Sequence, residues 1–124
     1  MSQIDDLCAA IRARPADPWD WDTMAAFTHY SRWHFARVFR RRIGVTPGRF
    51  VAQVRLEAAR RLLASGQPLR IADVCTQVGY SSLGSFISTF GARYGLPPGL
   101  YRRRHASGTD PATTTTAPER TPAS

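Results

Sequence analysis

Two stretches of the chain carry one repeated pattern, WDTMAAFTHYSRWHFARVFRRRIGVTPGRFVAQVRLEAARRLL at residues 21–63 and IADVCTQVGYSSLGSFISTFGARYGLPPGLYRR at residues 71–103. One group of positions recurs after 50 residues: Trp21, Met24, Ala25 and Tyr30 match Ile71, Val74, Cys75 and Tyr80. A second group recurs after 51 residues: Phe35, Phe39, Gly44, Pro47 and Phe50 match Phe86, Phe90, Gly95, Pro98 and Tyr101. A single residue inserted near Ser81 and Ser82 accounts for the change of offset. Such a period indicates two copies of one supersecondary unit.

Each copy has the pattern of a helix, a tight turn, a second helix and then Gly-x-x-Pro-x-x-aromatic. The small residue in the first helix, Ala25 or Cys75, allows the second helix to pack close across it. The turn requires a residue that tolerates a positive φ, which Gly79 supplies in the second copy. His29 stands at this turn in the first copy, and histidine is one of the more tolerant side chains there, with some strain expected. The sequence therefore predicts two helix-turn-helix units.

Helical periodicity dominates the chain and no alternating strand of useful length is present, which predicts an all-α fold. We expect a loop at Arg14–Pro18 and caps at Asp20, Ser31 and Thr46, with Ser2 and Asp5 as a capping pair. The expected helices are one that runs from Ser2 to that loop, then Trp21–Thr28, Arg32–Arg42, Pro47–Ser65, Ile71–Val78, Leu83–Arg93 and Pro98–Arg104.

The predicted organisation is one domain over residues 1–105. Its first helix-turn-helix unit covers about 3–45, a long linker helix covers about 47–65, and the second unit covers about 70–104. The tail SGTDPATTTTAPERTPAS has no apolar periodicity, so residues 106–124 are expected to be disordered.

At this level of detail the sequence resembles the DNA-binding domain of the AraC/XylS family of bacterial transcription regulators. The resemblance covers about residues 4–104 and rests on the two quoted stretches. The second follows the family's C-terminal motif, in which Gly-Tyr-Ser precedes spaced aromatic residues and a Gly-x-x-Pro-x-x-Tyr-Arg ending. The resemblance implies two reading helices that enter successive major grooves of double-stranded DNA.

The positive charge is concentrated in one quarter of the chain. All 17 basic residues are arginine, and the formal net charge is +8. Between Ser31 and Arg61 one acid, Glu57, stands among nine arginines, which gives this segment the whole excess. These arginines are Arg32, Arg37, Arg40, Arg41, Arg42, Arg49, Arg55, Arg60 and Arg61. A local stripe of this kind is typical of a surface that binds a polyanion, and a solvated face is the alternative.

The first reading helix is the one expected at Arg32–Arg42, and its residues Phe35 and Phe39 share the face that we expect to be buried. Trp33, Ala36 and Arg37 lie on the opposite face, and the matching positions are among those that face the bases in the resembled family. Arginine can bond guanine O6 and N7 together, so Arg37 is the foremost candidate for base readout. We expect Arg32, Arg40, Arg41 and Arg42 to contact phosphates; packing of Trp33 or a phosphate contact by Arg37 are the open alternatives.

The second reading helix, expected at Leu83–Arg93, is predicted to contact the bases of DNA through Leu83, Gly84 and Ser88. It departs from the resembled family, whose members usually carry a basic residue at the position of Ser88 and near Gly91. Arg102 and Arg103 are candidate phosphate contacts, with a solvated helix end as the alternative. We therefore expect the first helix-turn-helix unit to supply most of the affinity for DNA.

The linker helix sets the reach of the two units. About 18 residues of helix span about 27 Å, and successive major grooves lie about 34 Å apart. The resemblance implies an asymmetric site of about two turns, which a monomer could fill. Double-stranded DNA is thus the expected partner, and RNA polymerase is a second partner to consider.

Other classes of protein are disfavoured. The chain has no apolar run near the ~18 residues that span a bilayer and no signal peptide. Its two cysteines, Cys8 and Cys75, fit a reducing cytoplasm, so we expect a cytoplasmic, nucleoid-associated protein. His29 and His34 are five residues apart, outside helical ligand spacing, so neither a metal nor a cofactor is expected.

Of two alternatives to a DNA-binding regulator, a repair enzyme is disfavoured and an interaction module or fragment stays open. A DNA-alkylation-repair enzyme needs an activated acceptor cysteine, whereas Cys8 and Cys75 lie at helix-core positions. An interaction module with weak DNA binding, or a fragment of a larger regulator, is favoured by the uncharged second unit. Only about 20 residues precede Trp21, which leaves no room within this sequence for a sensor domain.

Overall fold

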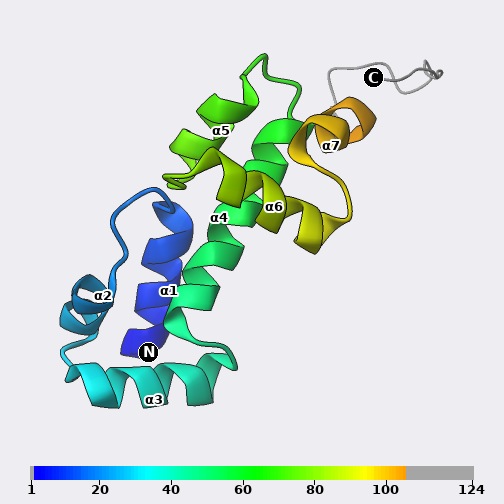
Figure 1. The fold of residues 1–124 in the computed structure, drawn as a ribbon. Coiled ribbons are helices and arrows are strands. Elements are labelled where there is room, and N and C mark those ends of the chain that lie inside the picture. Colours follow the sequence, from blue (N-terminus) through cyan, green and yellow to red (C-terminus); the bar gives the residue numbers. More distant parts are fainter. Residues whose placement is uncertain (1, 106–124) are drawn as a thin grey trace.

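The computed structural model describes residues 2–105, which form seven α-helices and no strand (Figure 1). In chain order the helices are α1 (Gln3–Ala13), α2 (Trp21–Thr28), α3 (Arg32–Ile43), α4 (Pro47–Ala64), α5 (Ile71–Gln77), α6 (Leu83–Tyr94) and α7 (Pro98–His105). The all-α prediction is confirmed, and the ends of the helices fall within one residue of those expected. The predicted disorder of residues 106–124 lies outside the described residues.

Short side chains cap the helices where the sequence indicates. Each cap accepts a hydrogen bond from a backbone N–H three residues later: Asp20 from Thr23 at 2.8 Å, Ser31 from His34 at 3.2 Å and Thr46 from Arg49 at 3.3 Å. Pro47 occupies the first turn of α4, where its missing N–H costs nothing. These caps fix where α2, α3 and α4 begin.

The expected capping pair at the start of α1 is only half correct. Ser2 caps the helix, but its hydroxyl accepts from the N–H of Ile4 at 3.1 Å. The carboxylate of Asp5 accepts two hydrogen bonds from Arg42 instead. A partner 37 residues away in sequence, with a planar pair of donors, thus takes the carboxylate that local spacing assigns to the cap.

Two hydrophobic cores lie along α4, one in each helix-turn-helix unit. The first core contains residues of α1, α2 and α3, and the second contains residues of α5 and α6. The same helix serves both: it gives Phe50, Val51 and Val54 to the first core and Leu56, Ala59 and Leu63 to the second. The two units, α2–α3 and α5–α6, are therefore joined by a helix that belongs to both (Figure 1).

The internal repeat extends to the packing of aromatic rings. The rings of Phe35 and Phe39 are 5.7 Å apart and tilted at 60°, and those of their counterparts Phe86 and Phe90 are 5.8 Å apart at 56°. Phe39 meets Phe50 edge to face at 5.6 Å, as Phe90 meets Tyr101 at 5.4 Å. Edge-to-face contacts of this kind are worth about 0.5–1.5 kcal/mol beyond burial. The repeated residues therefore build the same packing unit twice.

Both turns between paired helices use a left-handed residue, as predicted. Gly79 has φ +101°, and His29 has φ 64° and ψ 15°. His29 is the one residue other than glycine with a positive φ within residues 2–105. A side chain in this conformation costs free energy that glycine avoids. The first turn therefore carries the strain that the sequence suggests.

Candidate nucleic-acid interface

Helix α3 has one face in the first core and the opposite face in solvent. Phe35 and Phe39 are fully buried, whereas Trp33 is 87% exposed. Arg37 is also exposed, and Ala36 is half-buried between the two faces. Tryptophan usually buries most of its surface, so an indole held in solvent in the first turn of a helix is a candidate contact residue. The predicted outward orientation of Trp33 and Arg37 is confirmed; their contact with DNA stays a prediction.

Ion pairs already engage the two terminal arginines of this helix. Arg32 Nε lies 3.3 Å from Asp22 of α2, and Arg42 Nη2 lies 2.5 Å from Asp5 of α1. Hydrogen bonds from Arg42 lower the pKa of the Asp5 carboxyl below its ordinary value. A phosphate would have to compete with these carboxylates, or share the guanidinium with them. Contact of Arg32 and Arg42 with phosphates stays a prediction with this added condition.

The other three arginines of α3 have no internal ion pair or hydrogen bond within residues 2–105. Arg37, Arg40 and Arg41 are exposed, and no hydrogen bond or ion pair within residues 2–105 engages their guanidinium groups. Arg40 and Arg41 also lie in the last turn of the helix, where positive charge is favourable next to the unpaired carbonyl groups. These three side chains can meet an anion without breaking an internal contact.

Two arginines of the charged stripe have structural partners instead. Arg55 is half-buried and donates to the carbonyl oxygens of Pro15 and Asp17. Arg60 lies over the ring of Tyr94, with its Cζ 5.9 Å from the ring centroid. Fewer arginines are thus available to a polyanion than the count in the sequence suggests, because partners elsewhere in the fold occupy Arg55 and Arg60. The sequence alone does not reveal these partners.

Helix α6 presents an apolar and neutral face where α3 presents a cationic one. Leu83 and Ile87 are exposed to 42% and 38%, and Gly84 and Ser88 are exposed beside them. Ile87 was missed as a candidate, although the 51-residue offset that relates the second helices places it at the position of Ala36. The complete repeat therefore adds Ile87 to the predicted contact residues Leu83, Gly84 and Ser88.

Packing within the described residues does not require the two glycines on this side of α6. A Cβ atom at Gly84 or Gly91 would meet nothing within 4 Å, and neither glycine has a positive φ. Glycine in a helix interior is destabilising by about 1 kcal/mol relative to alanine. Close approach of an external molecule is a physical reason for leaving this surface bare.

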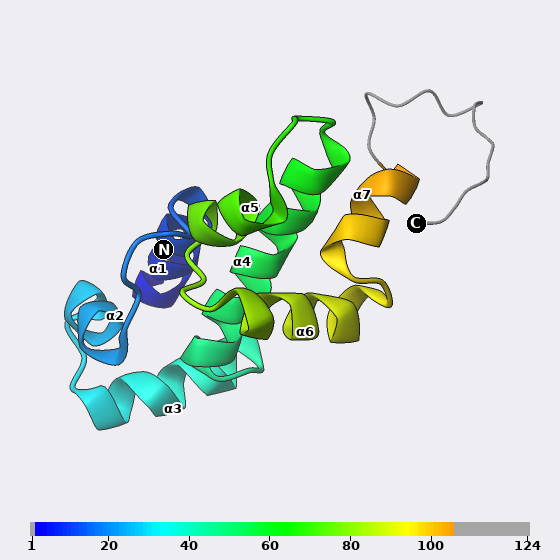
Figure 2. The same ribbon diagram turned by 45° about the horizontal axis from the view of Figure 1, so that its top comes forward.

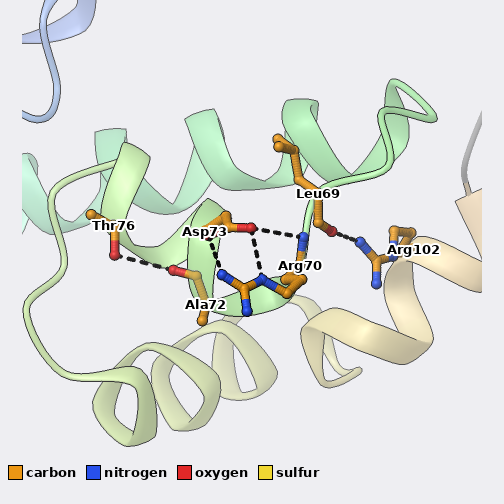
Figure 3. Close-up of polar contacts among 6 residues, drawn as sticks. All are labelled: Leu69, Arg70, Ala72, Asp73, Thr76 and Arg102. Atoms are coloured by element: carbon orange, nitrogen blue, oxygen red, sulfur yellow. Dashed lines mark hydrogen bonds and ion pairs between the residues drawn. The ribbon is translucent and has the colours of Figure 1, made fainter.

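The arginines of α7 are only partly available. Arg102 is half-buried and donates through Nη1 to the carbonyl oxygen of Leu69, in the loop before α5 (Figure 3). In the same view, Arg70 pairs with Asp73 at 3.1 Å. Arg103 is exposed on α7. Arg102 therefore ties α7 to the α4–α5 loop, and its predicted contact with phosphate would add to that role.

The two candidate reading helices lie along one side of the molecule. Figure 2 shows α3 and α6 along the lower side of the molecule, where α6 crosses in front of α4 and α3 joins the lower end of α4. The exposed positions Trp33 and Arg37 belong to one of these helices, and Leu83 and Ile87 belong to the other. This arrangement can present two helices to one elongated ligand.

The two cysteine thiols lie inside the hydrophobic cores of the described residues. Cys8 and Cys75 are buried and unpaired, and burial raises the pKa of each thiol. Cys75 Sγ lies 3.6 Å from the carbonyl oxygen of Tyr80. A nucleophilic thiol needs a lowered pKa and access to solvent, which is the opposite environment. Within residues 2–105 no cluster of three or more His, Cys, Asp or Glu is placed to hold a metal ion.

Comparison with known proteins connects this fold to transcription regulators. A family model described as a helix-turn-helix domain matches residues 24–104. The chain is 37% identical over 101 residues to an uncharacterised HTH-type transcriptional regulator of Haemophilus influenzae, covering 82% of this chain and 34% of that protein. It is 30% identical over 102 residues to the HTH-type transcriptional activator AarP of Providencia stuartii, covering 82% and 74%. The chain thus spans about a third of the first of these relatives and most of the second.

Solved structures agree with this result. The DNA-binding domain of AdpA, a global transcriptional factor crystallised with a target DNA, matches with TM-score 0.78 and 25% identity over 83% of this chain and 92% of that one. A probable AraC family regulator from Rhodopseudomonas palustris matches with TM-score 0.76 and 26% identity, over 84% of this chain and 97% of that one.

Over residues 2–105, no helix has the length and apolar character that crossing a membrane requires.

Proposed function

The chain belongs to the AraC-type helix-turn-helix family, and we propose that it is a sequence-specific transcription regulator that binds double-stranded DNA. The observation that carries the proposal is the outer face of α3. There an exposed indole and exposed, unengaged guanidinium groups stand on a helix whose other face is locked into a core. A helix of this kind fits the major groove and presents its first turns to the base edges.

The first unit would supply most of the affinity and of the base readout. Arg37 would bond guanine O6 and N7 with its two parallel donors. Trp33 would contact a thymine methyl or a sugar, and Ala36 is small enough for the helix to approach the bases closely. Arg40 and Arg41 would meet phosphates, which position the helix without reading sequence.

The second unit would make a looser contact through shape and apolar surface. Leu83 and Ile87 can contact thymine methyl groups, which are the apolar feature of the major groove. Bare backbone at Gly84 would allow close approach of the DNA. Few charges support this unit, since Asp73 and Arg93 are the only charged residues from 71 to 101, and Arg93 lies 3.6 Å from Glu57.

The two units, about residues 3–45 and 70–104 with the linker at about 47–65, would occupy successive major grooves of one asymmetric site. A monomer would suffice for such a site. RNA polymerase is the protein partner that a transcription role would bring, and the nucleoid in the cytoplasm is the corresponding location.

Selection from a random duplex pool, followed by binding measurements at several salt concentrations, tests the proposal. Six phosphate contacts would give a slope of log K against log salt of roughly −5. Recovery of one sequence pattern with a steep slope is the expected result. No enriched sequence together with a flat slope would overturn it.

A protein-interaction module is the second candidate, and the neutral, partly apolar face of α6 favours it. In that case a partner protein would bind this face and DNA affinity would be weak. A repair enzyme that accepts methyl groups is disfavoured by the buried thiols. Incubation with methylated DNA followed by mass measurement of the protein distinguishes this class, because methyl transfer would add mass at a cysteine.

A further inference from the structure

A loop of the first helix-turn-helix unit touches the turn of the second. The loop that joins α1 to α2 reaches the turn between α5 and α6, and the two lie side by side in both views (Figures 1 and 2). A Cβ atom built on Gly79 would lie only 3.0 Å from the Cα of Ala16. Gly79 therefore meets two requirements, the positive φ of its turn and close approach of backbone from the other unit.

Arg55 of α4 lies at this junction. Its Nε donates to the carbonyl oxygen of Pro15 at 2.8 Å and its Nη2 to that of Asp17 at 2.9 Å. The same Nε would lie 2.8 Å from a Cβ at Gly79. One guanidinium thus binds the loop of the first unit while it packs against the turn of the second.

The position of Arg55 in sequence is equally informative. Val54 belongs to the first core and Leu56 to the second, so Arg55 lies where α4 passes from one unit to the other. Burial lowers the pKa of its guanidinium below the ordinary value. The carbonyl oxygens of Pro15 and Asp17 compensate for part of that burial, because they accept hydrogen bonds from two of its N–H donors.

The loop bound by Arg55 is itself well held. The indole Nε1 of Trp19 donates to the carbonyl oxygen of Arg14 at 2.7 Å, and the Asp17 backbone N–H donates to the same carbonyl at 3.2 Å. The Trp19 ring also meets Phe27 of α2 edge to face at 6.4 Å. The loop is therefore connected to α2 and, through the first core, to α3.

We propose that Arg55, the loop at 15–17 and the turn at Gly79 form an inter-unit bracket that fixes the rotation of α6 relative to α3 about the linker helix, and so sets the spacing of the two DNA half-sites that the protein accepts. This inference rests on the proposed function for its DNA part. Helix α4 alone fixes the separation of the units along its axis. The bracket adds a second connection away from that axis, which resists twisting.

Half-site spacing gives the functional test. Each inserted base pair moves one half-site by about 3.4 Å and turns it by about 35°. The wild type is expected to lose about fivefold or more in affinity when one base pair is inserted or removed between the halves of the selected site, as for a mismatched base pair. Arg55→Lys, which can satisfy only one carbonyl in the same geometry, is expected to flatten this dependence. Arg61→Lys, on the exposed side of the same helix, is the matched control.

A measurement without DNA tests the bracket itself. Spin labels at Ala26→Cys on α2 and Ala92→Cys on α6 would report the distance between the units, since both positions are exposed and the native thiols are buried. One narrow distance distribution is expected for the wild type and for Arg61→Lys, and a broader one for Arg55→Lys with unchanged helical content. An equally narrow distribution in folded Arg55→Lys, or a broad one in the wild type, would overturn the bracket. Failure of all variants to bind DNA, with the spin-label result as expected, would overturn the proposed function and the spacing claim but not the bracket.

Discussion

At the scale of single residues, the value of an arginine depends on what it already contacts. Arg37 has no internal partner within residues 2–105, and Arg42 is paired with Asp5. Arg55 donates its hydrogen bonds to backbone carbonyl oxygens. Each of these three side chains carries the same formal charge. Only an unengaged guanidinium can bind a ligand without an internal loss, so Arg37 is the residue on which base recognition should depend most.

Replacement of Arg37 tests base readout. Arg37→Ala is expected to cost about 1–3 kcal/mol of binding free energy and to relax preference at one base pair. Arg37→Lys keeps the charge but loses the paired donors, so it should lose the base preference while it retains most of the salt dependence. Affinity for the selected duplex and for its single-base variants would be measured. Equal losses from Arg37→Ala and Ser88→Ala would contradict the asymmetry between the units.

At the scale of helices, the bare surface of α6 sets stability against function. Gly91→Ala is expected to raise the free energy of unfolding by about 0.5–1 kcal/mol, because it lies inside the helix and a Cβ there meets nothing within 4 Å. Gly84→Ala lies in the first turn on the proposed reading face, and it should lower DNA affinity more than Gly91→Ala. Urea unfolding and duplex binding of both variants give the two readouts. A loss of stability in either variant would show that the glycine has a packing role.

The cap of α2 predicts how the fold responds to acid. Hydrogen bonding from the Thr23 backbone N–H lowers the pKa of the Asp20 carboxyl. The carboxylate therefore stabilises the fold at pH values above its unfolded pKa of about 4, and this contribution is lost as the pH falls through the lower folded value. Asp20→Asn keeps an oxygen acceptor but does not titrate, so its urea midpoint should fall less steeply below about pH 4 than that of the wild type. Asp20→Ala should be less stable at neutral pH as well.

Helices and turns were predictable from the sequence because their causes are local. Apolar spacing, the caps at Ser31 and Thr46, and glycine at Gly79 each act within a few residues. The exposed face of α3 followed from the same periodicity. The partners of Asp5, Arg55 and Arg102 were not predictable, because each lies more than 30 residues away in sequence and depends on how the helices pack. Those three contacts occupy charged groups that the sequence alone leaves open to a ligand.

At the scale of the whole molecule, the same fold occurs twice, once with a cationic exposed face and once with a neutral, partly apolar one. The cores and ring geometries of the two units match closely, so the fold itself does not distinguish them. Charge does, since the segment from 31 to 61 carries the net charge of the chain and the segment from 71 to 101 carries none in sum. The two halves of a bound site should therefore differ in salt dependence, with most of the phosphate contacts in the half bound by α3.

Removal of thymine methyl groups tests the other half of this asymmetry. Uracil in place of thymine in the half-site bound by α6 deletes methyl groups and leaves every hydrogen-bonding edge intact. If Leu83 and Ile87 contact those methyls, each lost contact should cost about 0.8 kcal/mol, or about fourfold in affinity. The double variant Leu83→Ala, Ile87→Ala should bind the thymine and uracil duplexes equally, and both side chains are exposed enough to be shortened without opening the second core. A double variant that still prefers thymine would place the methyl recognition elsewhere, and no preference in the wild type would leave α6 as a surface for a partner other than these bases.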